Sequence, residues 1–197
     1  MRDLWVHVGR LWTNGEPFLA IDAALRGGWR GYSNDDFGQV ITLGWQHTSV
    51  PAGTGRAVLV GADGVVRDDS WIEVFHTGTG HLAFVQASGP HYPDALARAL
   101  SYPVADDQDG DVLEAASGKL AIFSAATDGT GPYSGPWATA EPGPVPPVHG
   151  PPSREADPGL LIPVPHSRYK LKVRWHTMLD EDNCFARWLL IPHTAND

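Results

Sequence analysis

Histidine has the widest chemical range of the residues in this sequence, because its imidazole binds metal ions and transfers protons near neutral pH. The 197-residue chain contains nine histidines. His76 and His81 flank a short glycine-containing segment and could converge on one ion, and His47 offers a further imidazole. The chain has no H-x-H or H-E-x-x-H motif, so histidines in solvated turns are the better interpretation. A small-ligand-binding or metal-binding β-sandwich enzyme that uses His76 and His81 is the alternative hypothesis.

The other catalytic signatures are incomplete. Residues 78–83 (GTGHLA) match the letters of a dinucleotide-binding fingerprint, but the sequence after the glycines indicates a strand instead of the required helix. No G-x-S-x-G nucleophile elbow and no phosphate-binding G-x-x-x-x-G-K-[ST] motif occurs. The single cysteine, Cys184, follows the acidic segment Asp180–Asp182, whose charge disfavours a reactive thiolate. We therefore predict a protein that is not an enzyme and that needs no cofactor or metal.

The most distinctive charged segment is 105–114, which carries five carboxylates and no cation. Its spacing does not fit an EF-hand loop, because the glycine and the ligands fall at other positions. Such a run is usually a solvated loop, and the functional alternative is an anionic surface that binds a basic protein. The candidate partner-binding carboxylates of this acidic run are Asp106, Asp107, Asp109, Asp111 and Glu114.

Two aromatic residues complete the candidate binding set. Tyr133 and Trp137 lie among prolines and glycines, outside every strand that the sequence predicts. An aromatic side chain in such a segment either folds back over the core or anchors a partner. Both alternatives are open, and we include Tyr133 and Trp137 among the candidate partner-binding residues.

Short β-type segments separated by turn residues must position these side chains. The chain has 22 glycines and 17 prolines, and apolar and polar residues alternate clearly in Tyr169–His176. This alternation is typical of a strand with one buried and one solvated face. One short helix is predicted from Tyr92 to Leu100, because Pro93 suits a first helical turn. The predicted strands are 4–8, 17–22, 39–45, 56–61, 71–76, 82–87, 118–125, 160–164, 169–177 and 185–191.

Residues 129–159 form a proline- and glycine-rich segment, which predicts a long loop without helix or sheet. The strands after it are too few to enclose a core of their own, so they must complete a sheet begun upstream. The predicted fold is therefore mainly β, with residues 1–197 in a single domain. It is an antiparallel β-sandwich or curved sheet with one short helix and a long proline-rich loop over 129–159.

The amino-acid composition and net charge exclude several classes of protein. The sequence is 42% hydrophobic and 19% charged, which indicates a folded core. There are 23 acidic and 14 basic residues, and the net charge of −9 argues against nucleic-acid binding. No apolar run approaches the ~20 residues of a membrane-spanning helix. Because the N-terminus has no signal-peptide pattern, we expect a cytoplasmic protein.

Several segments resemble the competence protein J family. The resemblance is carried by 118–129 (GKLAIFSAATDG), 161–175 (LIPVPHSRYKLKVRW) and 187–192 (RWLLIP), and more weakly by 32–45 (YSNDDFGQVITLGW) and 48–50 (TSV). That family comprises small cytoplasmic bacterial inhibitors of a DNA-entry nuclease, and related proteins occur beside toxins as immunity proteins. The resemblance implies an inhibitor, whereas the proline-rich segment and the length of the middle region depart from the family pattern.

The leading hypothesis is a cytoplasmic, acidic binding protein that inhibits a basic nuclease or toxin by protein–protein contact. It predicts a basic protein partner and neither a nucleic-acid nor a membrane partner. The acidic run would face the cationic surface of the enzyme, and a few aromatic side chains would form the desolvated centre.

Overall fold

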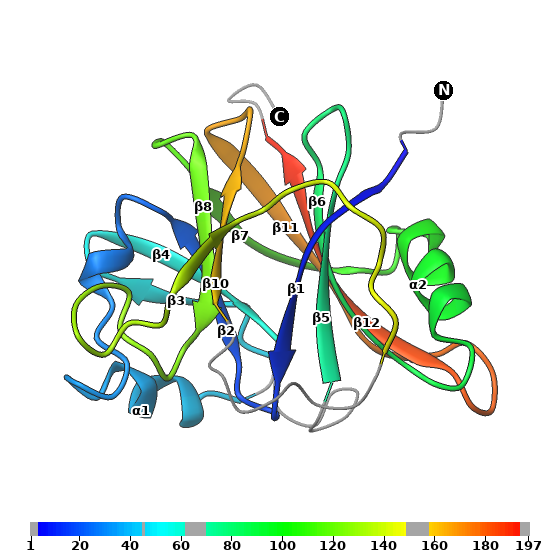
Figure 1. Ribbon diagram of the computed structural model, residues 1–197, viewed down its shortest axis with the longest axis horizontal. Helices are drawn as coiled ribbons and strands as arrows, with labels where there is room; N and C mark the ends of the chain where they lie inside the picture. Colours follow the sequence, from blue (N-terminus) through cyan, green and yellow to red (C-terminus); the bar gives the residue numbers. More distant parts are fainter. Residues whose placement is uncertain (1–3, 45, 62–69, 149–157, 194–197) are drawn as a thin grey trace.

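The computed structural model describes residues 4–44, 46–61, 70–148 and 158–193 (Figure 1). Strands dominate it, which confirms the mainly-β prediction. The first six-stranded sheet has the order β1-β5-β6-β12-β11-β7, and all its neighbouring strands are antiparallel. Its strands are β1 (Val6–Thr13), β5 (Ser70–His76), β6 (Leu82–Ser88), β7 (Gln108–Glu114), β11 (Arg168–Met178) and β12 (Cys184–Pro192).

The second six-stranded sheet has the order β3-β4-β2-β8-β10-β9. Its neighbouring strands are antiparallel except β9 and β10, which run parallel. Its strands are β2 (Phe18–Asp22), β3 (Ser49–Ala52), β4 (Gly55–Val60), β8 (Lys119–Ser124), β9 (Trp137–Thr139) and β10 (Gly159–Pro163).

The inner faces of the two sheets share one apolar core. Leu11, Phe84 and Trp188 of the first sheet pack in the same buried cluster as Val60 and Leu120 of the second. Sheet-on-sheet packing around a shared core is the arrangement of a β-sandwich, as the sequence predicts. The alternation in β11 is also confirmed, because its apolar residues 169, 171 and 173 are buried and its cationic residues are partly exposed.

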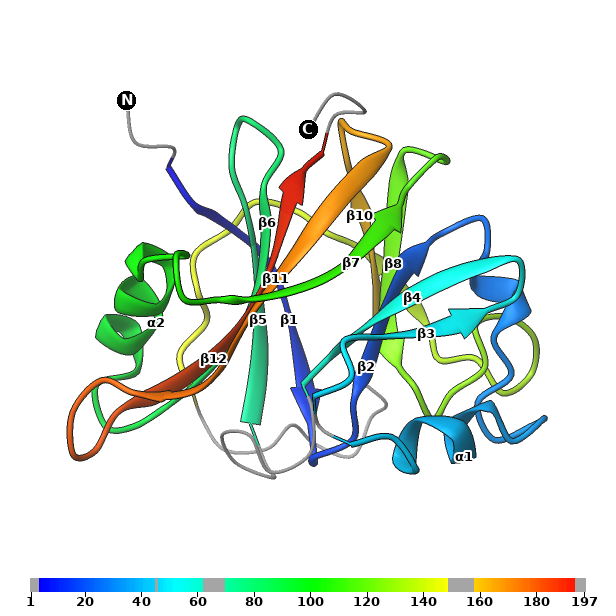
Figure 2. The same ribbon diagram turned by 180° about the vertical axis from the view of Figure 1, so that it is seen from behind.

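Helices cover the outer faces of the sheets (Figures 1 and 2). The predicted short helix is present as α2 (Tyr92–Ser101), with Pro93 in its first turn. Ala95, Leu96 and Ala99 of α2 pack against apolar residues on the outer face of the first sheet. Burying one stripe of a helix against a sheet is the usual reason for such an amphipathic pattern.

The strand predicted at 39–45 is wrong over its described part, where a helix is found instead. Helix α1 (Asp36–Ile41) follows the 3₁₀ turn η1 (Arg26–Gly28) on the outer face of the second sheet. The Asp36 carboxylate accepts a hydrogen bond from the Arg30 amide at 2.7 Å, which ties the first turn of the helix to the preceding segment. Val40 is buried while Ile41 is 63% exposed, so only one face of this short helix packs on the sheet.

The proline-rich segment is only partly irregular. Its residues Trp137–Thr139 form β9, so the expectation that no sheet forms between 129 and 159 is wrong there. After β9 the chain crosses β1, and the amides of Glu141 and Gly143 donate to the carbonyls of Val8 and His7, both at 3.0 Å (Figure 1). The segment therefore covers the edge of β1, which would otherwise expose unpaired backbone groups. Residues 149–157 of the predicted loop lie outside the described part.

None of the helices in the described part of the chain has both the length and the apolar character needed to span a bilayer.

Candidate functional site

The acidic run is a strand over most of its length, not a solvated loop. Strand β7 pairs antiparallel with β11, and this register sets carboxylates beside cations. Asp109 lies opposite Lys172, with 2.8 Å between Nζ and Oδ1, and the Lys172 hydrogen bond lowers the pKa of Asp109. Glu114 lies opposite Arg168, with 2.9 Å between Nε and Oε1. Opposite charges across a strand pair favour this pairing.

The other carboxylates of the run also have cationic neighbours. Asp111 accepts a hydrogen bond from the Ser49 hydroxyl, and its carboxylate is 2.9 Å from the Arg56 guanidinium. These contacts lower the pKa of Asp111, the Ser49 hydrogen bond contributing most. Asp106 is more loosely placed, 3.9 Å from Arg174 and mostly exposed.

Asp107 is the carboxylate of the run that is fully buried. Its two oxygens each lie 2.7 Å from a guanidinium nitrogen, one of Arg174 and one of Arg187. Arg187 is itself buried and also donates to the carbonyls of Ala99 and Tyr102. Asp107 therefore holds the segment after α2 against the first sheet and is not available as a surface charge.

We call these paired groups the charge ladder: Asp106, Asp107, Asp109, Asp111 and Glu114, with Arg56, Arg168, Lys170, Lys172, Arg174 and Arg187. Figure 2 shows its strand β7 running from the α2 side of the first sheet toward β4 and β8 of the second. The premise that the acidic run presents unpaired negative charge is wrong, because the cations of β11, β12 and β4 reach it. A role of these five carboxylates in partner binding loses its electrostatic basis.

The excess negative charge must then reside elsewhere. Nine of the eleven lysines and arginines in the described part of the chain form ion pairs with a carboxylate. A chain of net charge −9 that uses its cations internally leaves carboxylates without cationic partners on its surface. Glu16, Asp35 and Asp36 are three such residues, since they form no ion pair with any cation among the residues described.

Glu16, Asp35 and Asp36 lie near the most exposed tyrosines of the described chain. Tyr32 is 68% exposed and Tyr133 is 69% exposed. Burial and then the negative charge of Glu16 raise the pKa of Tyr32. Asp35 and Asp36 follow Tyr32 at the beginning of α1. We call Glu16, Tyr32, Asp35, Asp36 and Tyr133 the tyrosine face.

Backbone hydrogen bonds hold the two segments of the tyrosine face together. Arg30 and Asp128 form an isolated antiparallel bridge. The Tyr32 amide donates to the Ala126 carbonyl at 3.1 Å, and the Asp128 amide donates to the Tyr133 carbonyl at 3.1 Å. The loop between β8 and β9 therefore lies beside the segment that leads into α1, as both ribbon views show.

Side-chain contacts, centred on the buried Asp128, reinforce this junction. The Asp128 carboxylate, 1% exposed, accepts a hydrogen bond from Ser33 at 2.6 Å and lies 3.6 Å from Arg30. The Tyr32 ring packs edge-on against Phe37, with centroids 5.1 Å apart. The exposed tyrosines thus stand on backbone that is already fixed.

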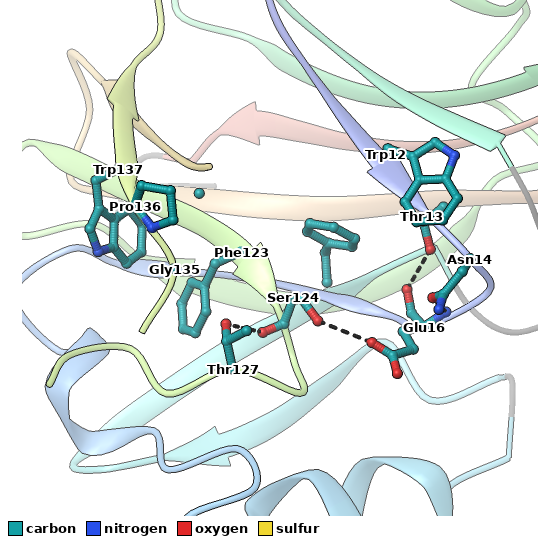
Figure 3. A pocket seen from close by; sticks show the side chains of 12 residues that line it. Trp12, Thr13, Asn14, Glu16, Phe123, Ser124, Thr127, Gly135, Pro136 and Trp137 are labelled. Atoms are coloured by element: carbon teal, nitrogen blue, oxygen red, sulfur yellow. Dashed lines mark hydrogen bonds between the residues drawn. The ribbon is translucent and has the colours of Figure 1, made fainter. Parts of the chain in front are cut away.

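An aromatic pocket of about 210 Å³ adjoins the tyrosine face, where the ends of the two sheets meet (Figure 3). Trp12 from the end of β1 stands on one side, and Trp137 of β9 stands on the other. Its lining residues are Trp12, Thr13, Asn14, Glu16, Phe18, Phe123, Ser124, Thr127, Gly135, Pro136, Trp137 and Gly159.

Polar groups occupy one rim of the aromatic pocket. Glu16 is the only charged residue in its described lining, and its carboxylate accepts a hydrogen bond from the Ser124 hydroxyl at 3.4 Å. The Thr127 hydroxyl donates to the Ser124 carbonyl at 3.0 Å. Figure 3 shows these groups below the aromatic rings, so the pocket has apolar walls and an anionic rim.

Trp137 lies partly over the core and partly in this pocket. Its ring packs edge-on against Phe123 with centroids 5.4 Å apart, and the Arg26 guanidinium stacks 5.3 Å from its centroid. Of the two alternatives for Trp137, the structure shows the packed one, but the ring still lines an open pocket. Tyr133, by contrast, extends into solvent.

The histidines do not converge on a site in the described chain. His81 contacts the Thr79 hydroxyl at 3.1 Å, and His166 contacts the Thr79 carbonyl at 3.1 Å. His47 is exposed and contacts the carbonyl of Gly44. No group of three or more His, Cys, Asp or Glu side chains within the described ranges could hold a metal ion. The hypothesis built on His76 and His81 therefore gains no supporting geometry.

Sequence reasoning missed most of this site. Trp12, Glu16, Phe18, Tyr32 and Phe123 carry no motif, and they come from three segments: residues 12–18, Tyr32 and Phe123. The one available signal was the high number of tryptophans, eight in 197 residues.

Comparison with known proteins finds no match: no family model, no curated protein and no solved structure is significantly similar to this chain.

Proposed function

We propose that this protein binds and inhibits a basic protein of the nuclease or toxin class, and that it does so through the tyrosine face. The observation that carries the proposal is a pair of tyrosines, each more than two thirds exposed, beside carboxylates that no described cation neutralises. Tyrosine is enriched at protein interfaces because it combines a large apolar ring with a hydroxyl that remains hydrated or finds a partner.

The rigidity of the tyrosine face supports a role in binding. Association costs less conformational entropy when the contacting side chains stand on backbone that is already ordered. The Arg30–Asp128 bridge and the Ser33–Asp128 hydrogen bond provide that order. A tyrosine side chain with only two rotatable torsions then supplies contact area at low entropic cost.

Electrostatics favours a cationic partner. Glu16, Asp35 and Asp36 give the tyrosine face a negative potential that no local ion pair cancels. Enzymes that bind phosphate groups of nucleic acids carry cationic grooves, and complementary charge speeds encounter between two proteins. A protein that covers such a groove would block access of the nucleic acid. The resemblance of residues 118–129 and 161–175 to competence protein J supports the same class of partner.

The test uses the purified protein encoded beside this gene. We expect that protein to be a nuclease or toxin whose activity disappears when one equivalent of this protein is added. Association rates measured by stopped flow are expected to fall at least tenfold between about 50 and 500 mM salt, because screening weakens long-range attraction.

A nuclease of unrelated sequence serves as the control and is expected to keep its activity. If the neighbouring protein retains full activity at a tenfold excess of this chain, the proposal is wrong. Inhibition whose rate does not depend on salt would contradict the electrostatic part of the proposal and leave the inhibitory part in place.

A further inference from the structure

We infer that the aromatic pocket binds one arginine side chain of the partner, with Glu16 as its counter-ion. This inference rests on the proposed function and names the group of the partner that the site recognises. It is carried by the size of the pocket, the chemistry of its walls and rim, and its continuity with the tyrosine face.

The size of the pocket suits one side chain. Sites for drug-sized ligands and cofactors usually enclose about 300–1,000 Å³. The aromatic pocket encloses about 210 Å³, below that range. A single long side chain presented by a protein surface fits such a volume, and the rest of the binding area then comes from the surface around the pocket.

The walls favour a cation. Trp12 and Trp137 flank the pocket, and the faces of aromatic rings attract guanidinium groups through their quadrupoles. The molecule already uses this interaction twice outside the pocket. Arg10 lies 4.8 Å from the centroid of the Trp71 ring, and Arg174 lies 5.2 Å from that of Tyr102.

The rim distinguishes arginine from lysine. Glu16 supplies a carboxylate, and Ser124 and Thr127 supply hydroxyl oxygens on the same side of the pocket. A planar guanidinium has five donors in a fixed fork and stacks on an aromatic face, so it satisfies several acceptors at once. A lysine ammonium is a compact, strongly hydrated charge and gains less from this arrangement.

Arg26, a described cation that contacts a wall of the pocket, does not occupy the pocket. Arg26 stacks against Trp137 at 5.3 Å and donates to the Ala23 carbonyl at 2.6 Å, but it is not among the lining residues. The negative charge of Glu16 is thus not cancelled by an ion pair with any residue described.

The pocket and the tyrosine face form one continuous surface. Glu16 belongs to both, because it lines the pocket and raises the pKa of Tyr32. The loop that carries Tyr133 continues directly into Gly135, Pro136 and Trp137 of the pocket lining. A partner that covers the tyrosines therefore has the pocket within its footprint.

The test requires no partner protein. The probes are the peptides acetyl-Gly-Arg-Gly-amide and its neutral citrulline analogue, with a lysine peptide as a third. Binding is followed by NMR through the indole N–H signals of Trp12 and Trp137, assigned with the Trp12→Phe and Trp137→Phe variants. We expect the arginine peptide to shift both signals in a saturable way, and the other two to bind about tenfold more weakly.

The matched variants are Glu16→Gln and Glu141→Gln. Glu141 is an exposed carboxylate that does not line the pocket. We expect Glu16→Gln to reduce binding of the arginine peptide to the level of the citrulline peptide and Glu141→Gln to leave it unchanged. Equal binding of the arginine and citrulline peptides, or no effect of Glu16→Gln, would overturn the inference. A lysine peptide that binds as tightly as the arginine peptide would overturn the preference for arginine.

The outcome also separates this inference from the proposed function. Inhibition of the neighbouring protein without binding of the arginine peptide would refute only the role of the pocket. Binding of the arginine peptide without inhibition would refute the proposed function and leave the ligand preference of the pocket standing.

Discussion

The charge ladder and the tyrosine face contain the same kind of residue in opposite circumstances. In the charge ladder, every carboxylate of the acidic run has a lysine or arginine within 4 Å. On the tyrosine face, Glu16, Asp35 and Asp36 have no described cationic partner, and Tyr32 and Tyr133 are more than two thirds exposed. In the charge ladder, the carboxylates form ion pairs that help to hold strands together. On the tyrosine face, the carboxylates have no described cationic partner.

The difference shows that a run of carboxylates in a sequence does not locate a negative surface. The partners of Asp109 and Glu114 lie more than 50 residues away, on β11, and meet them only through the strand register. Surface potential follows from which charges remain after the sheets have formed. The following predictions test whether the two regions differ in this way, beginning with the largest expected effect.

Removal of the buried charge in the ladder is expected to destabilise the fold strongly. Asp107→Asn leaves the guanidinium groups of Arg174 and Arg187 without their shared carboxylate, and breaking one partner of a buried pair costs about 3–5 kcal/mol. Urea denaturation followed by tryptophan fluorescence measures the loss. Asp106→Asn is the control, because Asp106 is mostly exposed and its ion pair is long, so little change is expected. Similar effects of the two substitutions would show that Asp107 is not buried between cations.

A second buried carboxylate, Glu73, is expected to make the stability of the fold depend on pH. Glu73 is fully buried on β5 and accepts hydrogen bonds from His7 at 2.8 Å, Arg10 at 2.8 Å and Tyr92 at 2.7 Å. Burial alone would raise the pKa of Glu73, but these hydrogen bonds outweigh burial and hold it below the ordinary value of 4.5. The ionised form of Glu73 therefore stabilises the native state above that value.

Glu73→Gln is expected to cost roughly 1.5–3 kcal/mol at neutral pH, the usual contribution of a hydrogen bond to a charged group. Because the pKa of Glu73 is lower in the folded state, the wild-type protein loses this advantage as the pH falls below about 4.5 and through the folded pKa. Urea denaturation of both proteins from pH 7 to pH 3 measures the difference. A constant difference over that range would mean that Glu73 is not the group that titrates.

Most of the fold was accessible from the sequence because its strands are short, apolar and separated by glycine and proline. Except for residues 39–45, each predicted strand has a counterpart in the structure. Strand β7 was missed because its carboxylates are stable in a sheet only opposite the cations of β11, which is a long-range condition. Helix α1 was missed because burial of Val40 against the outer face of the second sheet outweighs the β propensity of the segment.

The candidate site was much harder to predict from the sequence than the fold. Tyr133 and Trp137 were among the residues predicted from the sequence, and their role in binding stays a prediction. The residues around them were not predicted. Glu16 becomes relevant only because the turn after β1 brings it to Ser124 and Tyr32. Pockets that form where several strand ends meet have no local sequence pattern, whereas strands do.

On the tyrosine face, the largest expected effect is on binding and not on folding. Tyr32→Ala and Tyr133→Ala each remove a ring that is more than two thirds exposed, and truncation of a central interface tyrosine typically weakens binding by about 2 kcal/mol, or about 30-fold. Surface plasmon resonance with the partner measures the dissociation constant. Met178→Ala is the control, since Met178 is 54% exposed at the far end of β11. Equal losses for all three variants would indicate that the tyrosines are not anchors.

The smallest effect is expected for Glu114→Gln in the exposed part of the charge ladder. Its ion pair with Arg168 is partly solvated, with side chains 59% and 39% exposed, and such pairs contribute at most about 1 kcal/mol to stability. Because Arg168 neutralises Glu114 locally, we also expect the affinity for the partner to change less than twofold. Denaturation in urea and surface plasmon resonance measure the two quantities on the same variant. A tenfold loss of affinity with unchanged stability would show that the partner contacts the acidic run. The proposed difference between the charge ladder and the tyrosine face would then be wrong.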